Sequence, residues 1–243
     1  MVTKINGIVL VIALLLIVSL MSANAVLAVP EGLDNITIID SQTNTPTLGA
    51  PVTAQGGNIT WLNISLKSQT GAWQGFVGNI TNSGLVLDDT SGDRFYSWNL
   101  TNTSGEIYAS RNSSIYWYNI QPQNICAVDE LLTGSGSDKT SRTYTASANT
   151  VNFSVGAILI NSSSACSALP NVNNTVQSTL GTNFFENIIL TTSSTALNST
   201  IYTGILQQAG TAGFDTGYYN FQLLVPVNST SGLNTYYIYA EIS

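Results

Sequence analysis

The chain has 243 residues, of which 8% are charged, and its formal net charge is −7. Nucleic-acid binding requires clustered lysine and arginine that displace counterions. The few cations here are scattered, which excludes nucleic acid as a partner. The chain also has no histidine, which excludes Ser-His-Asp and Cys-His catalytic arrangements.

The first 28 residues have the order of a secretory signal. Lys4 supplies one positive charge, a mainly apolar run extends from Ile8 to Met21, and small residues follow. This order predicts a signal helix, residues 1–28, that is cleaved after Ala25 or Ala28. The alternative is an uncleaved membrane anchor, because about 17–20 apolar residues can span a bilayer. We expect an extracellular protein, secreted or associated with the cell surface, that meets the membrane only through this segment if it stays uncleaved.

Residues 29–57 are rich in Thr, Gly and Pro and are predicted to form an extended leader with at most one edge strand. Over residues 58–243, short runs with apolar side chains at alternate positions are separated by turn residues, which is the pattern of half-buried strands. The predicted fold is therefore all-β: an antiparallel β-sandwich of jelly-roll or Ig-like type, single or divided near residue 140 into two packed sandwiches. The clearest runs are Leu62/Ile64/Leu66, Tyr96/Trp98/Leu100, Val151/Phe153/Val155, Ile201/Thr203/Ile205, Phe221/Leu223/Val225 and Tyr236/Ile238/Ala240/Ile242.

N-glycosylation acceptor patterns are the strongest motif signal. They are about twice as frequent as the roughly six expected by chance from this composition. On three predicted strands the acceptor Asn lies on the face opposite the apolar side chains, where a glycan would be accessible. We therefore predict covalent N-glycans, which require a eukaryotic or archaeal export route. The acceptors are Asn35, Asn58, Asn63, Asn79, Asn99, Asn102, Asn112, Asn152, Asn161, Asn173, Asn198 and Asn228.

The turn at residues 88–93 carries Asp88, Asp89 and Asp93. Calcium takes six to eight oxygen ligands, so these carboxylates are weak calcium candidates. Their spacing departs from an EF-hand loop, and a solvated hairpin turn is the favoured interpretation. We predict no metal and no cofactor.

Aromatic residues alternate within several predicted strands. The four tryptophans are expected to pack in the core. Tyr116 and Tyr118, and likewise Tyr237 and Tyr239, lie opposite their apolar neighbours. Exposed tyrosine rows are common in interfaces, so these two pairs are candidate contact strips.

The two cysteines, Cys126 and Cys166, both lie in the predicted exported part. In an oxidising compartment a single disulfide is the simplest pairing. A metal site built on two cysteines would lack histidine partners.

No catalytic motif is present. The chain has no G-x-S-x-G elbow and no Walker-type Gly-Lys-Ser/Thr sequence. A pair of carboxylates for glycoside hydrolysis is the one arrangement left open. We therefore expect that the protein is not an enzyme.

Two blocks of sequence resemble a group of secreted, sequon-rich archaeal cell-surface proteins of unassigned function. One block is Trp73–Thr81 with Gly105–Ser110, and the other is Tyr219–Pro226 with Thr235–Ile242. The resemblance implies export to the cell surface and an archaeal glycosylation route, and it supplies no catalytic residues. The N-terminus also resembles class III signals of archaeal pilins, in which a cut after Gly7 keeps the apolar helix, although Asn6 stands where such signals usually carry a charge.

Together these features predict a non-enzymatic, extracellular, N-glycosylated structural protein of the cell envelope or of an extracellular filament. Its expected partners are copies of itself or other cell-surface proteins, joined through β-edges or tyrosine strips. The alternatives are a carbohydrate-binding or adhesion module, in which aromatics and Asp turns hold a sugar, and a pilin-like subunit that retains its N-terminal helix.

Overall fold

The computed structural model describes residues 29–45, 48–81, 83–100, 103–126, 128–134, 136–146, 151–161, 164–173, 175, 185–192, 199–207, 210–228 and 233–242. It is mostly β, with 37% strand and 7% helix, and its sheets are antiparallel, which confirms the all-β prediction. The predicted signal helix, residues 1–28, lies outside the described residues. In the part of the chain that is described, no helix is long and apolar enough to cross a membrane.

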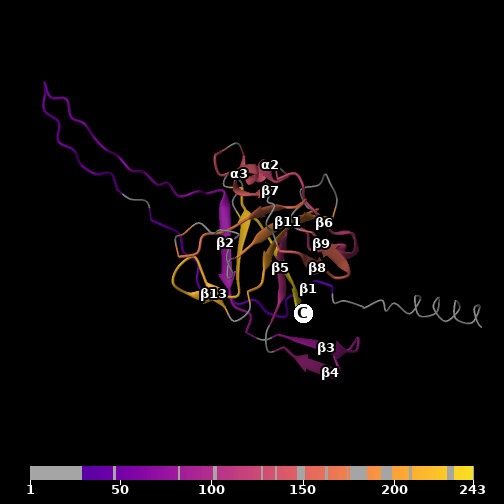
Figure 1. Ribbon diagram of the computed structural model, residues 1–243. Helices are drawn as coiled ribbons and strands as arrows, with labels where there is room; N and C mark the ends of the chain where they lie inside the picture. Colours follow the sequence, from indigo (N-terminus) through magenta and orange to yellow (C-terminus); the bar gives the residue numbers. More distant parts are fainter. Residues whose placement is uncertain are drawn as a thin grey trace, which may run out of the picture.

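An eight-stranded antiparallel sheet forms the centre of the molecule (Figure 1). Its strand order is β1-β16-β5-β12-β11-β10-β7, and β6 pairs with β11 as well. Strands from both sides of residue 140 belong to this sheet, so a division into two sandwiches at that point would cut it. The strands are β1 (Glu31–Gly32), β5 (Gly105–Ser110), β6 (Gln121–Pro122), β7 (Thr145–Ala146), β10 (Cys166–Ala168), β11 (Asn187–Thr191), β12 (Thr200–Ile205) and β16 (Tyr237–Ile242).

Four two-stranded ribbons and three short helices complete the described elements. The ribbons are β2 (Trp73–Gly78) with β15 (Phe221–Pro226), β3 (Gly84–Asp88) with β4 (Arg94–Asn99), β8 (Phe153–Val155) with β9 (Ile158–Ile160), and β13 (Thr211–Ala212) with β14 (Tyr218–Tyr219). The helices are the 3-10 helix η1 (Trp117–Asn119) and the single turns α2 (Glu130–Thr133) and α3 (Thr140–Thr143).

Both faces of the central sheet are buried. Successive side chains of a strand point to opposite faces, and on β11 Ile188 packs in one apolar cluster while Ile189 packs in the other. The first cluster includes the β8–β9 hairpin and Trp117 of η1, and the second includes β15. Burial on two sides explains why β11 and β12 are buried at every position, whereas a strand with one solvated face would alternate.

The β15–β2 ribbon meets the sheet mainly through β15, and Trp73 of β2 also packs against the second apolar cluster. The side-chain amide of Asn187 donates to Gln222 O at 2.7 Å and its oxygen accepts from Leu224 N at 2.8 Å. The hydroxyls of Tyr144 and Tyr236 donate to Leu224 O and Pro226 O at 2.8 and 2.7 Å. Side chains of the central layer thus occupy one edge of β15, β2 pairs with its other edge, and β2 lies outermost.

Residues 48–70, here called the arm, leave the body as a long out-and-back excursion (Figure 1). Asn58 N donates to Gln55 O at 3.2 Å at its tip, where Gly57 has a φ of +85° that favours glycine. All of these residues are described, and none belongs to a strand. The half-buried strand predicted at 62–66 is therefore wrong, because no described residue pairs with it and Leu62, Ile64 and Leu66 are exposed.

The tryptophans divide between the core and the surface. Trp117 is buried and Trp73 is half-buried, as expected. Trp61 on the arm is 89% exposed and Trp98 on β4 is 49% exposed, which corrects the expectation of four core tryptophans. Alternating apolar and polar residues indicate an extended segment. They do not show whether the rest of the protein covers its apolar side.

Candidate functional site

Two glutamates lie side by side inside the molecule. Glu106 of β5 and Glu241 of β16 are direct cross-strand partners, and they are 7% and 9% exposed. The hydroxyl of Tyr108 lies 3.4 Å from Glu106 Oε2 and 3.3 Å from Glu241 Oε2. The backbone N–H of Gly156, in the β8–β9 turn, donates to both carboxyl oxygens of Glu241 at 2.9 and 3.0 Å. The pair is therefore held by the sheet on one side and by the hairpin on the other.

A third carboxyl faces the same hairpin. Glu186, which precedes β11, is 1% exposed and accepts from Val151 N at 3.0 Å through Oε2. Its Oε1 has no hydrogen-bond partner among the described residues. Burial disfavours the charged form of a carboxyl. It raises the pKa of Glu186 to about 7 and that of Glu106 to about 8, to which the charge of Glu241 adds, and it raises the pKa of Glu241 as well.

Glu106 and Glu241 form a buried acid pair, and Glu186 is a separate buried carboxyl, so none of the three is an accessible site. A glycosidase pair must flank a sugar and a water molecule, and Glu106, Glu186 and Glu241 are each less than a tenth exposed. Each of these carboxyls holds its proton to a higher pH in the folded chain than in the unfolded chain, so the free energy of unfolding depends on pH.

A second buried charge lies beside the disulfide. Asp129 is fully buried, its Oδ1 accepts from Arg111 Nη2 at 2.6 Å, and its Oδ2 accepts from the hydroxyl of Tyr202. Burial raises the pKa of Asp129 to about 6, and the positive charge of Arg111 opposes that rise. Cys126 and Cys166 are bonded with a Cα–Cα distance of 5.5 Å, which confirms the predicted disulfide and ties the segment before Asp129 to β10.

Replacing Asp129 with alanine should lower the free energy of unfolding by about 3–5 kcal/mol, because the largely buried guanidinium of Arg111 would lose its carboxylate. Chemical denaturation at neutral pH measures the loss. Asp88→Ala is the matched control, since Asp88 pairs with Arg94 at a solvated site, where an ion pair adds little stability. Equal losses in the two variants would show that Asp129 has no special structural role.

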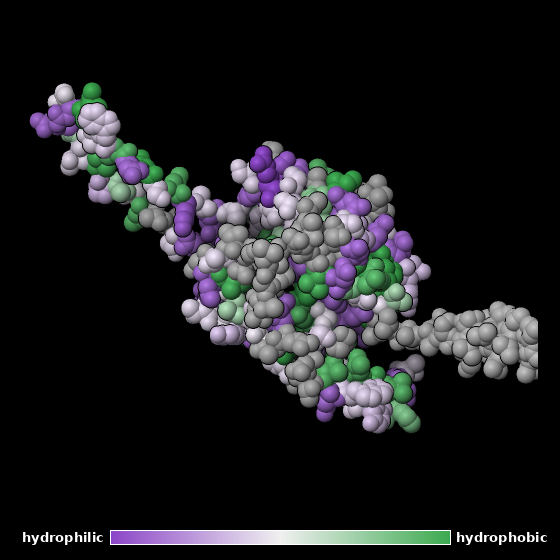
Figure 2. Space-filling view, viewed as in Figure 1, coloured by the Kyte–Doolittle hydropathy of each residue, from purple (hydrophilic) through white to green (hydrophobic). Residues whose placement is uncertain are grey.

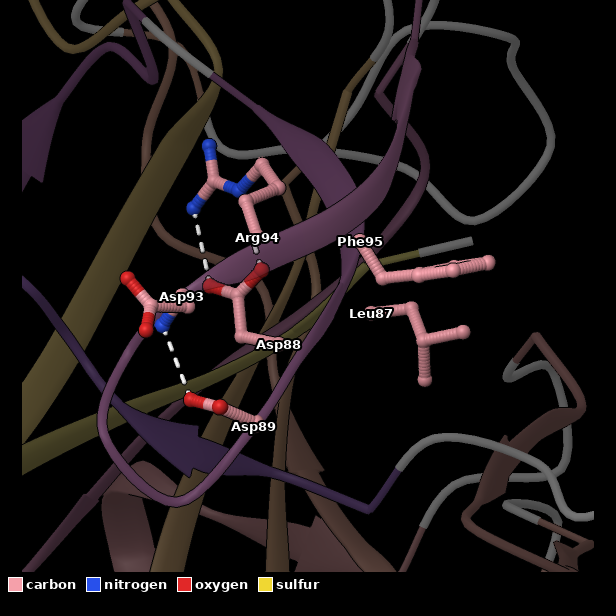
Figure 3. Close-up of a pocket in the computed structure, with 6 residues that line it drawn as sticks. All are labelled: Leu87, Asp88, Asp89, Asp93, Arg94 and Phe95. Carbon is pink, nitrogen blue, oxygen red and sulfur yellow. Dashed lines mark hydrogen bonds and ion pairs between the residues drawn. The ribbon is translucent and has the colours of Figure 1, made fainter.

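The calcium candidates lie in the β3–β4 turn (Figure 3). Asp88 accepts from Arg94 Nε and Nη2, both at 3.0 Å. Asp89 Oδ1 accepts from the backbone N–H of Ser91 and of Asp93 at 2.8 and 2.9 Å. These contacts explain the turn without an ion. Within the described ranges, no group of three or more Asp, Glu, Cys or His side chains is placed to hold a metal. The shallow pocket here is lined by Leu87, Asp88, Asp89, Asp93, Arg94 and Phe95.

None of the described acceptor asparagines is buried. Asn112 and Asn228 are partly exposed, and Asn102 and Asn198 lie outside the described residues. Accessibility is a requirement for glycosylation, and modification of these sites remains a prediction. The exposed acceptors are Asn35, Asn58, Asn63, Asn79, Asn99, Asn152, Asn161 and Asn173.

The two tyrosine strips have different positions. Tyr116 and Tyr118 are 67% and 69% exposed, and their rings are 5.7 Å apart. Tyr237 is 43% exposed, whereas Tyr239 is buried against Trp117 and donates its hydroxyl to Asn112 O at 3.0 Å. The second strip is thus wrong at Tyr239, because the β16 face that was expected to be solvated is covered.

Exposed apolar side chains extend along the arm, where Figure 2 shows hydrophobic residues. Leu62, Ile64 and Leu66 are 58%, 76% and 85% exposed, and they share one side of an extended segment, opposite Asn63 and Ser65. Lys67 is the only charged residue of the arm. Contiguous exposed apolar surface on a soluble protein marks an interaction site, which makes the arm the candidate functional site.

Sequence patterns did not single out Glu106, Glu241 or Asp129. For Glu241 the alternation predicts a solvated position, since it lies opposite Ile238, Ala240 and Ile242 on β16. Asp129 is in a loop, where no periodicity applies. No family model, curated protein or solved structure matches the chain.

Proposed function

We propose that the chain is a non-enzymatic, N-glycosylated structural protein of the cell envelope or of an extracellular filament, and that it assembles with copies of itself. It would be exported through residues 1–28, and its resemblance to archaeal cell-surface proteins suits an archaeal source of the glycans. A β-sandwich of jelly-roll or Ig-like form belongs to this proposal as the finer description of the fold.

The apolar arm carries the proposal. Burying a Leu or Ile side chain stabilises by about 1.5–3 kcal/mol, and the monomer leaves most of the surface of Leu62, Ile64 and Leu66 exposed. The same segment carries polar side chains and the acceptor Asn63 on its other side. An extended segment with one apolar side and one polar, glycan-bearing side fits a protein that remains soluble during export and buries its apolar side on assembly.

A triple substitution on the arm tests self-assembly. Leu62→Ser, Ile64→Ser and Leu66→Ser together should raise the concentration of half-assembly by at least about a thousandfold, from three lost contacts. Sedimentation velocity of the secreted chain over a range of concentrations measures it. The matched control is Ile36→Ser, Ile38→Ser and Ile39→Ser, which removes exposed isoleucines from the leader outside the arm. A wild-type chain that stays monomeric at every concentration would refute the proposal.

A carbohydrate-binding function is the second candidate, and one observation favours it. Tyr116 and Tyr118 present two exposed rings beside each other, and a sugar can stack on such a pair. A monomeric chain that binds a glycan array and loses that binding on Tyr118→Ala would favour this candidate over assembly.

A further inference from the structure

We propose that the outer edge of β2 receives the arm strand, residues 58–66, of a second copy, which adds a third strand to the β15–β2 ribbon. The choice of a second copy as the partner rests on the proposed function. The location of the receiving edge rests on the hydrogen bonds of the ribbon.

The ladder identifies which backbone groups of β2 point outward. Val227 N donates to Ala72 O at 2.8 Å and Asn220 N donates to Gly78 O at 3.0 Å, so the even-numbered residues of β2 face β15. Backbone groups of successive residues in a strand point to opposite edges. Those of Trp73, Gly75 and Val77 therefore point away from β15, toward the outer edge.

Among the described residues, no strand pairs with this outer edge. Gly75 O accepts from the side chain of Gln74 at 2.7 Å, and no described residue hydrogen-bonds the outward N–H groups of Gly75 and Val77. Natural edge strands are commonly blocked by charge, proline or a bulge. The strand Trp73–Gly78 has none of these, and its pairing with β15 is regular over all six residues.

The arm strand has the complementary properties. It is extended, its backbone belongs to no ladder, and it alternates apolar and polar side chains over Leu62–Leu66. Residues 58–66 exceed the six positions of β2 in length. Strand addition uses backbone hydrogen bonds for affinity and alternate side chains for fit, and here each partner supplies an unpaired edge.

The arm of the same molecule is held away from its own β2. The hydroxyl of Thr70 bonds to Asp138 and accepts from Ala72 N at 3.1 Å. Trp73 Nε1 donates to Asp138 O at 2.5 Å. These contacts fix the root of the arm so that it leaves the body at the end of β2 (Figure 1). The contact therefore joins different surfaces of two copies, and a head-to-tail contact of this kind extends into a filament when it does not close.

Proline at Gly75 tests the edge. A Cβ at Gly75 would meet nothing within 4 Å, and proline would remove only an outward N–H, so the β15 ladder stays intact. Gly75→Pro should raise the concentration of half-assembly at least about tenfold through the lost hydrogen bond and the blocked edge. Gly75→Ala, which keeps the N–H, should assemble as wild type. Val77→Lys, which keeps every backbone donor, supplies a second test if the proline variant unfolds.

Mixing variants tests the head-to-tail arrangement. The arm triple variant keeps a receiving edge and Gly75→Pro keeps an arm, so the two together should form one-to-one dimers that do not grow, although neither assembles alone. Edge-to-edge pairing of two β2 strands would let the arm triple variant dimerise on its own, and that result, like a mixture that stays monomeric, would overturn the inference. If the wild type assembles but Gly75→Pro and Gly75→Ala behave alike, the edge is wrong and self-assembly stands. If the wild type never assembles, the proposed function itself fails.

Discussion

The chain should be most stable in mildly acidic solution and should lose stability as the pH rises from about 5 to about 8. Burial raises the pKa of Glu106 from 4.5 to about 8 and that of Glu186 from 4.5 to about 7. A carboxyl with a higher pKa in the folded chain binds more protons there than in the unfolded chain. Its contribution is complete below the unfolded pKa and is lost as the pH rises through the folded pKa. Each such group removes about 1.4 kcal/mol per pH unit within that window.

The variant Glu106→Gln should flatten this pH dependence. Glutamine keeps the shape of the side chain and cannot ionise beside Glu241, so the free energy of unfolding near pH 8 should rise above that of the wild type. Urea denaturation followed by circular dichroism at several pH values measures the slope. Glu31→Gln, the same change at an exposed residue of β1, is the control and should leave the slope unchanged. A wild-type stability that is level or rises between about pH 5 and pH 8 would contradict the role of the buried carboxyls.

Removing the disulfide should cost about 4 kcal/mol of unfolding free energy in the chain-entropy model. Cys126 and Cys166 are 40 residues apart, and the loop they close contains Asp129, α2, α3 and the β8–β9 hairpin. Without the bond, the unfolded chain gains the conformational entropy of that loop, which lowers the free energy of unfolding. The Cys126→Ala, Cys166→Ala variant should therefore unfold at a lower denaturant concentration than the wild type.

Reduction of the wild type provides an independent check on the same bond. In a thiol reductant at equilibrium, the wild type should approach the midpoint of the double alanine variant, while the variant itself should not respond to the reductant. A double variant as stable as the oxidised wild type would show that the loop is already restrained by other contacts, such as the Asp129–Arg111 pair.

The alternation of apolar and polar residues predicted strands correctly where one face of the strand is buried and the other is exposed. Phe153 and Val155 are buried and Ser154 is exposed on β8, as the alternation predicts. The disulfide followed from the cysteine count and the predicted compartment. The first inference depends only on residues close in sequence, and the second on there being two cysteines and therefore one possible pair. Neither requires knowledge of the complete fold.

The same alternation misassigned residues whose surroundings are set by distant segments. Tyr239 and Glu241 share a face of β16 that reads as solvated, yet the β8–β9 hairpin and η1 cover it. Ile64 lies in a run that reads as a core strand, yet it is exposed, because the contacts of Thr70 fix the arm root where the chain leaves the body. Whether a strand is buried on both faces, or lies exposed on an arm, depends on tertiary contacts. The periodicity of the local sequence carries no information about those contacts.

The geometry at the arm root has a mechanical consequence. β2 continues directly from the arm and runs antiparallel to β15 over six paired residues. Tension applied to the arm would pull β2 along its own length, so the ladder would be loaded in shear and its hydrogen bonds would share the force. The force would be transmitted from β15 to the central sheet by the side-chain hydrogen bonds of Asn187, Tyr144 and Tyr236. A fibre built from such links would resist stretching better than one whose strands are peeled apart one bond at a time.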